Sequence, residues 1–160
     1  MISVLNRKTS LNVNLFSVIK YIDKRGYFNQ IWTSDELVKN GFREGFIQLN
    51  MAKSSFGVLR GMHRQNQTKM LHVLQGKIFD AVLNPETGEW DGWILEEGDS
   101  IIIPPNLAHG YLVLSESALV QYAVDKPYDP NSQEVFKWDK FNIIWPLAIR
   151  PILSNGDIEA

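Results

Sequence analysis

The residues best suited to chemistry lie close together between positions 57 and 69, where the sequence reads GVLRGMHRQNQTK. This stretch holds Arg60, His63, Arg64, Gln65 and Lys69, and residues 46–79 contain no Asp or Glu. A protein surface normally mixes charges of both signs, so a basic segment interleaved with apolar residues is typical of the wall of an anion-binding pocket. The alternative interpretation is a solvated basic loop.

These residue types suit proton transfer beside a carbonyl group. A neutral histidine such as His63 is a usable base near neutral pH. A lysine in a dry pocket stabilises a developing oxyanion far better than it would in water. A tyrosine on the other side of the substrate can return the proton, and Arg60 and Arg64 suit a phosphorylated substrate. We therefore expect removal of a proton next to a carbonyl group, followed by reprotonation on the opposite face.

Composition excludes several other classes of function. The 160 residues fit a single domain, and the net charge of −2 argues against general nucleic-acid binding. The absence of cysteine excludes thiol catalysis, and neither a G-x-S-x-G motif nor a Gly-rich phosphate loop occurs. The amino terminus has no signal-peptide apolar run, and no apolar segment reaches 18 residues. We therefore expect a cytoplasmic protein with no membrane and no nucleic-acid partner.

The spacing of apolar residues predicts an all-β fold. Short apolar runs bounded by turn residues predict strands at 13–22, 27–32, 46–51, 57–64, 70–74, 77–83, 90–95, 101–103, 109–114 and 118–124. Capping hydroxyls and early acidic residues predict one short helix over 34–39. So many short strands indicate a closed or double-sheet architecture. The run Gly98-x5-Pro104-x4-His109 resembles the second cupin motif, in which a histidine is delivered into a jelly-roll barrel.

Two longer patterns narrow the assignment. The first reads Gly57-Val-Leu-Arg60-Gly-Met-His63-Arg-Gln65, followed by Lys69 and Gly76. The second reads Ile103-Pro104-Pro105-x-x-Ala108-His109-Gly110-Tyr111, followed by Tyr122, Tyr128-x-Pro130, Trp138-Asp139, Ile144-Trp145-Pro146 and Leu153-Ser154-x-x-Asp157. In order and spacing, from Arg25-Gly26 to Asp157, these patterns resemble the signature of the dTDP-4-dehydrorhamnose 3,5-epimerases.

The resemblance implies a metal-free, cofactor-free cupin jelly roll with short peripheral helices, formed by residues 1–160. It also implies a homodimer in which the N-terminal strands, about residues 1–32, are exchanged between subunits. The substrate would be a nucleoside-diphosphate 4-keto-6-deoxy sugar, whose ketone makes the C3 and C5 protons acidic. The histidines at 63, 72 and 109 have no metal-ligand spacing, which agrees with a site that does its chemistry with side chains alone.

The resemblance also implies a role for each residue that it matches. His63 would be the base, oriented by Asp157, while Lys69 would stabilise the enolate oxygen. Tyr122 would deliver the proton from the opposite face. The remaining positions would bind the sugar, the diphosphate or the nucleotide base: Arg60, His109, Arg25, Gln48, Asn50, Tyr128, Gln65, Arg64, Gln133 and Glu134.

Several positions depart from the family pattern. A family glutamate near the N-terminus is Gln30 here, and a second one falls on Gln133, next to Glu134. Where the family has an aromatic residue after the catalytic histidine, this sequence has Arg64. Where the family has a basic residue before the last aspartate, this sequence has Gly156. These departures leave open the nucleotide (dTDP, GDP or CDP), the sugar, and whether C3, C5 or both are epimerised. An isomerase or a non-catalytic sugar-nucleotide-binding cupin remains the alternative.

Structural interpretations compete for individual residues. Tyr122 lies in an alternating strand, where a core tyrosine is the ordinary interpretation. His72 is expected to be structural, because strand alternation directs it away from the face that carries Lys69. Asp80 sits inside an apolar strand, so it requires a partner if it is buried. It would then support His63 or Lys69, and the alternative is that it faces solvent.

Overall fold

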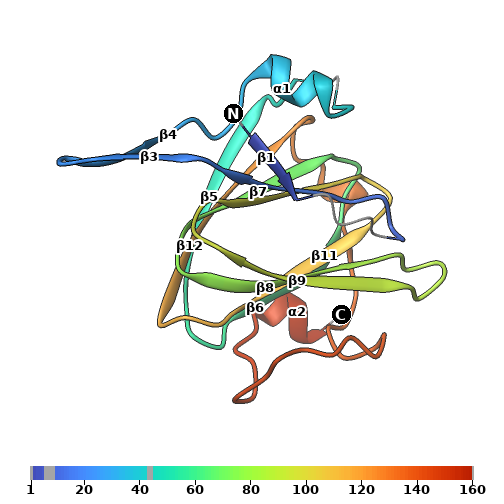
Figure 1. Ribbon diagram of the computed structural model, residues 1–160. Coiled ribbons are helices and arrows are strands. Elements are labelled where there is room, and N and C mark those ends of the chain that lie inside the picture. Colours follow the sequence, from blue (N-terminus) through green and yellow to red (C-terminus); the bar gives the residue numbers. More distant parts are fainter. Residues whose placement is uncertain (1, 6–9, 43–44, 160) are drawn as a thin grey trace.

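Two β-sheets stacked face to face form the body of the protein, which we describe from a computed structural model covering residues 2–5, 10–42 and 45–159 (Figure 1). The strands are β1 (Ile2–Leu5), β2 (Asn14–Val18), β3 (Lys20–Asp23), β4 (Gly26–Asn29), β5 (Gln48–Ser55), β6 (Leu59–Arg64), β7 (Lys69–Gln75), β8 (Lys77–Leu83), β9 (Trp90–Glu96), β10 (Asp99–Ile103), β11 (Ala108–Val113), β12 (Ser117–Val124) and β13 (Glu134–Val135). Helices α1 (Ser34–Lys39) and α2 (Asn155–Glu159) and a 3-10 turn (Pro130–Ser132) lie outside the sheets.

Non-consecutive strands are neighbours in both sheets. The six-stranded sheet has the order β1-β2-β10-β7-β12-β5, and the five-stranded sheet has the order β13-β6-β11-β8-β9. Antiparallel pairing with these crossovers is the arrangement of a jelly roll. The predicted all-β, double-sheet fold with short peripheral helices is therefore confirmed.

Three apolar clusters hold the layers together. The first fills part of the space between the sheets and includes Leu71, Val73, Ile101 and Val113. The second packs the C-terminal segment, with Trp145, against the outer face of the five-stranded sheet. The third covers the outer face of the six-stranded sheet and includes the following side chains: Phe16, Leu37, Met70, Ile102 and Ala123.

Helix α1 contributes to the third cluster and lies at the predicted position. The backbone N–H of Glu36 donates to Thr33 Oγ1 at 3.2 Å, which caps the helix, and Asp35 and Glu36 occupy the first turn. Leu37 is its one buried side chain, so a short helix is fixed by a cap and a single anchor. No helix in the described ranges is long and apolar enough to cross a membrane.

Strands β3 and β4 form a separate hairpin that projects from the body of the molecule (Figure 1). The sequence predicted one strand over 13–22, whereas the structure divides it into β2 and β3; the next predicted strand, 27–32, ends at Asn29. Ile22 and Phe28 in this hairpin are 79% and 67% exposed. Part of the N-terminal segment that was expected to exchange between subunits, residues 1 and 6–9, lies outside the described residues.

A bulge in β6 determines which of its side chains face the space between the sheets. His63 is the register partner of His109, and Arg60 is the partner of Tyr111, so three steps along β6 match two along β11. Arg60 and His63 consequently share one face of the strand. The two strands approach closely at Gly61, whose φ is 129° and where a Cβ would lie 2.5 Å from the Cα of Gly110. Glycine is therefore required there.

Candidate active site

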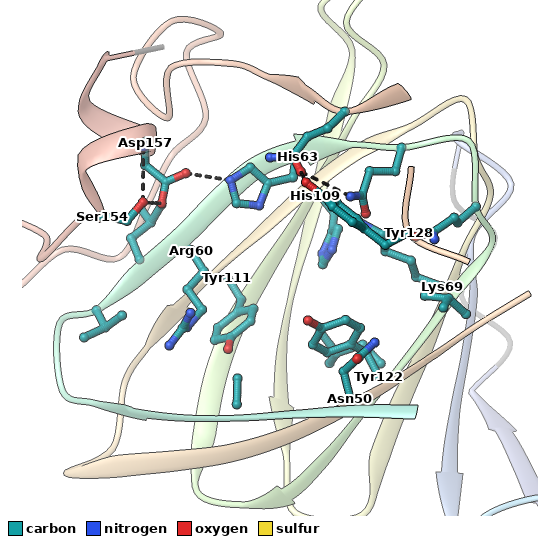
Figure 2. A pocket seen from close by; sticks show the side chains of 18 of the residues that line it. Asn50, Arg60, His63, Lys69, His109, Tyr111, Tyr122, Tyr128, Ser154 and Asp157 are labelled. Atoms are coloured by element: carbon teal, nitrogen blue, oxygen red, sulfur yellow. Dashed lines mark hydrogen bonds and ion pairs between the residues drawn. The ribbon is translucent and has the colours of Figure 1, made fainter. Parts of the chain in front are cut away.

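A cavity of about 630 Å³ opens between the two sheets. Most of the predicted site residues line it, and they come from both sheets and from the C-terminal segment (Figure 2). The predicted residues that line the cavity are Gln48, Asn50, Arg60, His63, Gln65, Lys69, His109, Tyr122, Tyr128, Gln133 and Asp157.

His63 and Asp157 form a hydrogen-bonded pair at one wall of this cavity. His63 Nε2 lies 2.6 Å from Asp157 Oδ1, and Asp157 is 4% exposed. Ser154 Oγ donates to the other carboxylate oxygen at 2.7 Å (Figure 2). Both carboxylate oxygens are thus engaged, which holds the carboxylate in one orientation. A buried carboxylate in this position fixes the histidine ring and stabilises its protonated state.

The C-terminal segment carries Asp157 to this wall by pairing with residues 57–59, at the start of the strand that contains His63. Ile152 donates its backbone N–H to Gly57 O at 2.9 Å and accepts from Leu59 N at 3.0 Å. Ser154 directly precedes α2, and its hydroxyl also accepts from the backbone N–H of Asp157 at 3.2 Å. The short helix α2 therefore serves to present one carboxylate.

Lys69, the first residue of β7, is buried at the cavity wall with 7% of its surface exposed. Burial lowers the pKa of Lys69 from 10.5 to about 8, and the charge of Asp80 opposes part of this shift. Within the described residues Lys69 makes no ion pair within 4 Å. An ammonium group held in a dry wall, without a carboxylate to neutralise it, is suited to stabilise an oxyanion.

Asp80 of β8 is fully buried and lies closest to His109 of β11, with 3.5 Å between Asp80 Oδ2 and His109 Nδ1. Burial raises the pKa of Asp80 and lowers the pKa of His109. The alternative that Asp80 faces solvent was therefore wrong. Its charged neighbour within 4 Å among the described residues is His109 instead of the predicted His63 or Lys69, although the charge of Lys69 still acts on Asp80. His109 lines the cavity, and Asp80 lies behind it.

Tyr122 of β12 faces the cavity from the six-stranded sheet, whereas His63 of β6 faces it from the five-stranded sheet. The register partner of Tyr122 on β5 is Asn50. A substrate between the sheets is thereby flanked by an imidazole on one side and a phenol on the other. Figure 2 shows this opposed arrangement.

The cavity mouth carries amides and an exposed tyrosine. Tyr128 donates its hydroxyl to Gln133 Oε1 at 2.9 Å, and Gln65 Nε2 donates to the same oxygen at 3.3 Å. On β5, Gln48 Nε2 donates to Asn50 Oδ1 at 2.9 Å. These neutral groups are suited to bind the base and the phosphates of a nucleotide without bringing a negative charge near them.

Three predicted binding residues are not brought into this cavity. Arg64 Nε and Nη2 bind the carboxylate of Glu134 at 3.0 and 2.9 Å, and its Nη1 pairs with Glu86. Because the bulge directs Arg64 to the outer face, Arg64 and Glu134 form a surface ion pair there instead of facing the substrate space. Arg25 is 83% exposed at the tip of the β3–β4 hairpin, where it pairs with Asp23.

His72 lies on the face of β7 opposite Lys69, as predicted. It is 1% exposed, and its Nδ1 lies 2.7 Å from Ser100 Oγ. Burial lowers the pKa of His72 to about 4, so it is a neutral, structural histidine. Among the described residues no three His, Asp or Glu side chains stand together as metal ligands.

Sequence reasoning missed several residues of the site. Ser154, Tyr111 and Gln67 line the cavity, and Ser54 accepts a hydrogen bond from Arg60 Nε at 3.0 Å. Ser154 and Tyr111 stood within the quoted motifs but received no role. The signal for Ser154 was its position three residues before Asp157, the spacing of a helix cap.

Comparison with known proteins agrees with this geometry. Residues 10–160 match the dTDP-4-dehydrorhamnose 3,5-epimerase family. The enzyme of that name from Methanothermobacter thermautotrophicus is 37% identical over 141 residues, which cover 81% of this chain and 76% of that protein. The solved dTDP-6-deoxy-D-glucose-3,5-epimerase of Legionella pneumophila, in complex with dTDP-4-keto-L-rhamnose, is 30% identical with a TM-score of 0.92 and coverage of 100% and 92%.

A second solved structure extends the comparison. The dTDP-4-dehydrorhamnose 3,5-epimerase of Bacillus anthracis, with TDP and PPi bound, is 29% identical with a TM-score of 0.89, covering 98% of this chain and 97% of that one. These similarities confirm the cupin-type jelly roll. The chain belongs to the dTDP-4-dehydrorhamnose 3,5-epimerase family.

Proposed function

We propose that this protein epimerises a dTDP-linked 4-keto-6-deoxy sugar by moving protons at C3 and C5. One observation carries the proposal: the His63–Asp157 pair and the Tyr122 phenol face each other across a single cavity that also holds a buried lysine, which makes no ion pair with the residues that the structure describes. Binding alone requires neither a base nor an acid on opposite walls. This arrangement therefore argues against a sugar-nucleotide-binding protein without catalytic activity.

The first step is removal of a proton from the carbon beside the ketone. His63 accepts this proton on Nδ1, because Nε2 faces Asp157 and carries the hydrogen of that bond. The electron pair of the broken C–H bond becomes the C=C bond of an enolate, and negative charge moves to the C4 oxygen. The Lys69 ammonium stabilises this oxygen, while Asp157 stabilises the imidazolium.

The second step returns a proton to the opposite face. Tyr122 lies on the other sheet, so its phenol approaches the enolate carbon from the side away from His63. The enolate collapses to the ketone as the C–H bond forms, and the configuration at that carbon is inverted. Reprotonation by His63 would restore the starting sugar, so the position of Tyr122 determines the stereochemical outcome.

We propose that the nucleotide lies at the mouth formed by Tyr128, Gln133 and Gln65, with Gln48, Asn50 and Arg60 toward the diphosphate. Tyr128 is 56% exposed, which leaves its ring free to stack on a base. The two solved relatives described above contain dTDP-4-keto-L-rhamnose or TDP. These observations favour dTDP over GDP and CDP.

We propose a homodimer in which the β3–β4 hairpin reaches the neighbouring subunit. The hairpin projects from its own body and exposes apolar side chains that a second copy would cover (Figure 1). Arg25 at its tip lies away from its own cavity, so a role in binding diphosphate requires the cavity of the partner. The cytoplasmic location stays a prediction.

The proposal is tested by mixing the protein with dTDP-4-keto-6-deoxy-D-glucose and following the C3 and C5 configurations by proton NMR. Conversion to a sugar inverted at both carbons is expected. Inversion at C3 alone would narrow the activity to a mono-epimerase, and no conversion at either carbon would contradict the proposal. The same measurement with GDP- and CDP-linked sugars determines the nucleotide preference.

A further inference from the structure

Tyr111 is a buried tyrosine whose hydroxyl makes no hydrogen bond of normal geometry to any described residue, although the hydroxyl of Ser54 lies near it. Four buried side-chain atoms among the described residues make no hydrogen bond of normal geometry: Asp80 Oδ1 and Oδ2, His109 Nδ1 and the Tyr111 hydroxyl; the 3.5 Å contact between Asp80 Oδ2 and His109 Nδ1 is too long or too bent to count as one. All belong to the adjacent strands β8 and β11, where Tyr111 and Asp80 are register partners. An unpaired polar atom costs folding free energy, so it indicates a group that a ligand or water completes.

Of these residues, Tyr111 and His109 line the cavity, whereas Asp80 lies behind them. Tyr111 is 5% exposed, and its phenol projects between the sheets beside Arg60, with its hydroxyl directed toward β5 (Figure 2). The guanidinium of Arg60 is already bonded to Ser54 through Nε at 3.0 Å. Burial raises the pKa of Tyr111, and Arg60 and the Ser54 hydroxyl beside it oppose part of this shift, so the phenol stays neutral and keeps a hydrogen that it can donate.

The register between β6 and β11 places Tyr111 relative to the reacting carbon. His63 and His109 form one cross-strand pair, and Arg60 and Tyr111 form the next pair on the same wall. Two residues of a strand span roughly 6.6 Å, which is about the width of a sugar ring with its substituents. When the reacting carbon of the sugar lies beside His63, another substituent of the same sugar ring therefore lies beside Tyr111.

The chemistry of the sugar indicates which substituent that is. A 4-keto-6-deoxyhexose linked at C1 keeps hydroxyl groups only at C2 and C3. The C3 hydroxyl changes position when C3 is inverted, so a fixed phenol pairs with it in only one epimer. The C2 hydroxyl keeps its configuration throughout, and it can both donate to and accept from a neutral phenol.

We propose that the Tyr111 hydroxyl binds the C2 hydroxyl of the sugar and makes the enzyme select 2-hydroxy over 2-deoxy substrates. The inference rests on the proposed epimerase function and names one further specificity-determining residue for it. A site built to bond a substrate hydroxyl rejects the analogue that lacks it, because the buried protein group is then left unpaired. Tyr111 thus acts on substrate choice, separately from the proton transfers of His63 and Tyr122.

The test compares wild type with Tyr111→Phe, which removes a single oxygen atom. We measure kcat/KM with dTDP-4-keto-6-deoxy-D-glucose and with its 2-deoxy analogue. Wild type should prefer the 2-hydroxy sugar by roughly tenfold or more, and Tyr111→Phe should lose that preference by reacting more slowly with the 2-hydroxy sugar alone. Tyr122→Phe is the matched contrast: it should slow both substrates equally and keep the preference.

Two further measurements separate the possible explanations. The affinity for dTDP should be unchanged in Tyr111→Phe, and the melting temperature of the free protein should be unchanged or higher, because the variant lacks a buried hydroxyl without a partner. The inference would be overturned if Tyr111→Phe kept the wild-type sugar preference. It would also be overturned if Tyr111→Phe lost as much affinity for dTDP as for the sugar nucleotide, because the hydroxyl would then bind the diphosphate. A lower melting temperature with unchanged selectivity would also overturn it, because the hydroxyl would then be bonded within the free protein.

The inference and the proposed function fail in different ways. If wild type converts neither sugar, the proposed epimerase function fails. The binding of dTDP-D-glucose against its 2-deoxy analogue by wild type and Tyr111→Phe still tests the inference, since neither compound has to react. If wild type is active and both proteins discriminate alike, only the inference fails.

Discussion

His63 Nε2 lies 2.6 Å from Asp157 Oδ1, although 94 positions separate the two residues in the sequence. The carboxylate is buried, and its second oxygen accepts a hydrogen bond from Ser154. This contact places the imidazole hydrogen on Nε2 and leaves Nδ1 as the basic atom. The base of the proposed reaction is therefore assembled from two distant parts of the chain, with His63 on β6 and Asp157 on α2.

Replacing Asp157 by Asn tests the importance of the charge at this contact. The amide keeps the size and can still accept the hydrogen from His63, but it cannot stabilise an imidazolium. We expect kcat to fall by roughly 10²–10⁴-fold, with the affinity for dTDP little changed. Ser154→Ala is the control: it should cost less than roughly tenfold, because it removes only an orienting bond. An Asp157→Asn enzyme with nearly normal kcat would contradict the role.

Lys69 should give the reaction an alkaline limit. Its pKa is lowered to about 8 by burial, and the oxyanion requires the protonated form. The rate should therefore fall as the pH rises through about 8. Lys69→Arg keeps the charge to much higher pH, so its remaining activity should show no such limit. A wild-type rate that stays constant to pH 10 would contradict the assignment.

Lys69 should also make the free energy of unfolding depend on pH, in a direction that follows from its lowered pKa. Between about 8, its pKa in the folded state, and the ordinary value of 10.5, the unfolded chain binds a proton at Lys69 that the folded protein lacks. The contribution of Lys69 to the free energy of unfolding should therefore rise with pH across this window. Urea unfolding at pH 8 and pH 10 should show this rise in wild type relative to Lys69→Met. An identical pH dependence in both proteins would contradict the lowered pKa.

Tyr122→Phe should separate proton removal from inversion. The variant retains His63, Asp157 and Lys69, so it can form the enolate and return the proton to the same face. Product formation should fall by roughly 10²–10⁴-fold, the usual scale for losing a general acid. In deuterated solvent, the recovered substrate should still gain deuterium at a measurable rate. Normal product formation would show that another group delivers the proton.

Arg64→Ala tests whether Arg64 binds substrate or only supports the surface. Its guanidinium pairs with Glu134 and Glu86, and both carboxylates are more than half exposed. We expect a loss of roughly 1 kcal/mol in unfolding free energy, since solvent weakens such pairs. KM and kcat should stay within about twofold of wild type. A large rise in KM would return Arg64 to the substrate site.

The sequence predicted the strands well because apolar alternation and turn residues report local structure directly. It did not predict the orientation of Arg64, because the bulge at Gly61 reverses the alternation of β6 between Arg60 and His63. The contact between Asp80 and His109 was also missed, since it depends on which strands pair across the sheet. Asp157 was placed by family resemblance, because nothing in its local sequence points to His63.

The central claim is that His63 removes a carbon-bound proton, and deuterium exchange tests it most directly. Wild type and His63→Ala are incubated in D2O with dTDP-4-keto-6-deoxy-D-glucose, and the C3 and C5 proton signals are followed by NMR. Affinity for dTDP, measured in parallel, shows that the variant is folded. Wild type should exchange both positions, and His63→Ala should exchange neither at a detectable rate. Exchange by His63→Ala at the wild-type rate, or no exchange by wild type at either carbon, would contradict the account.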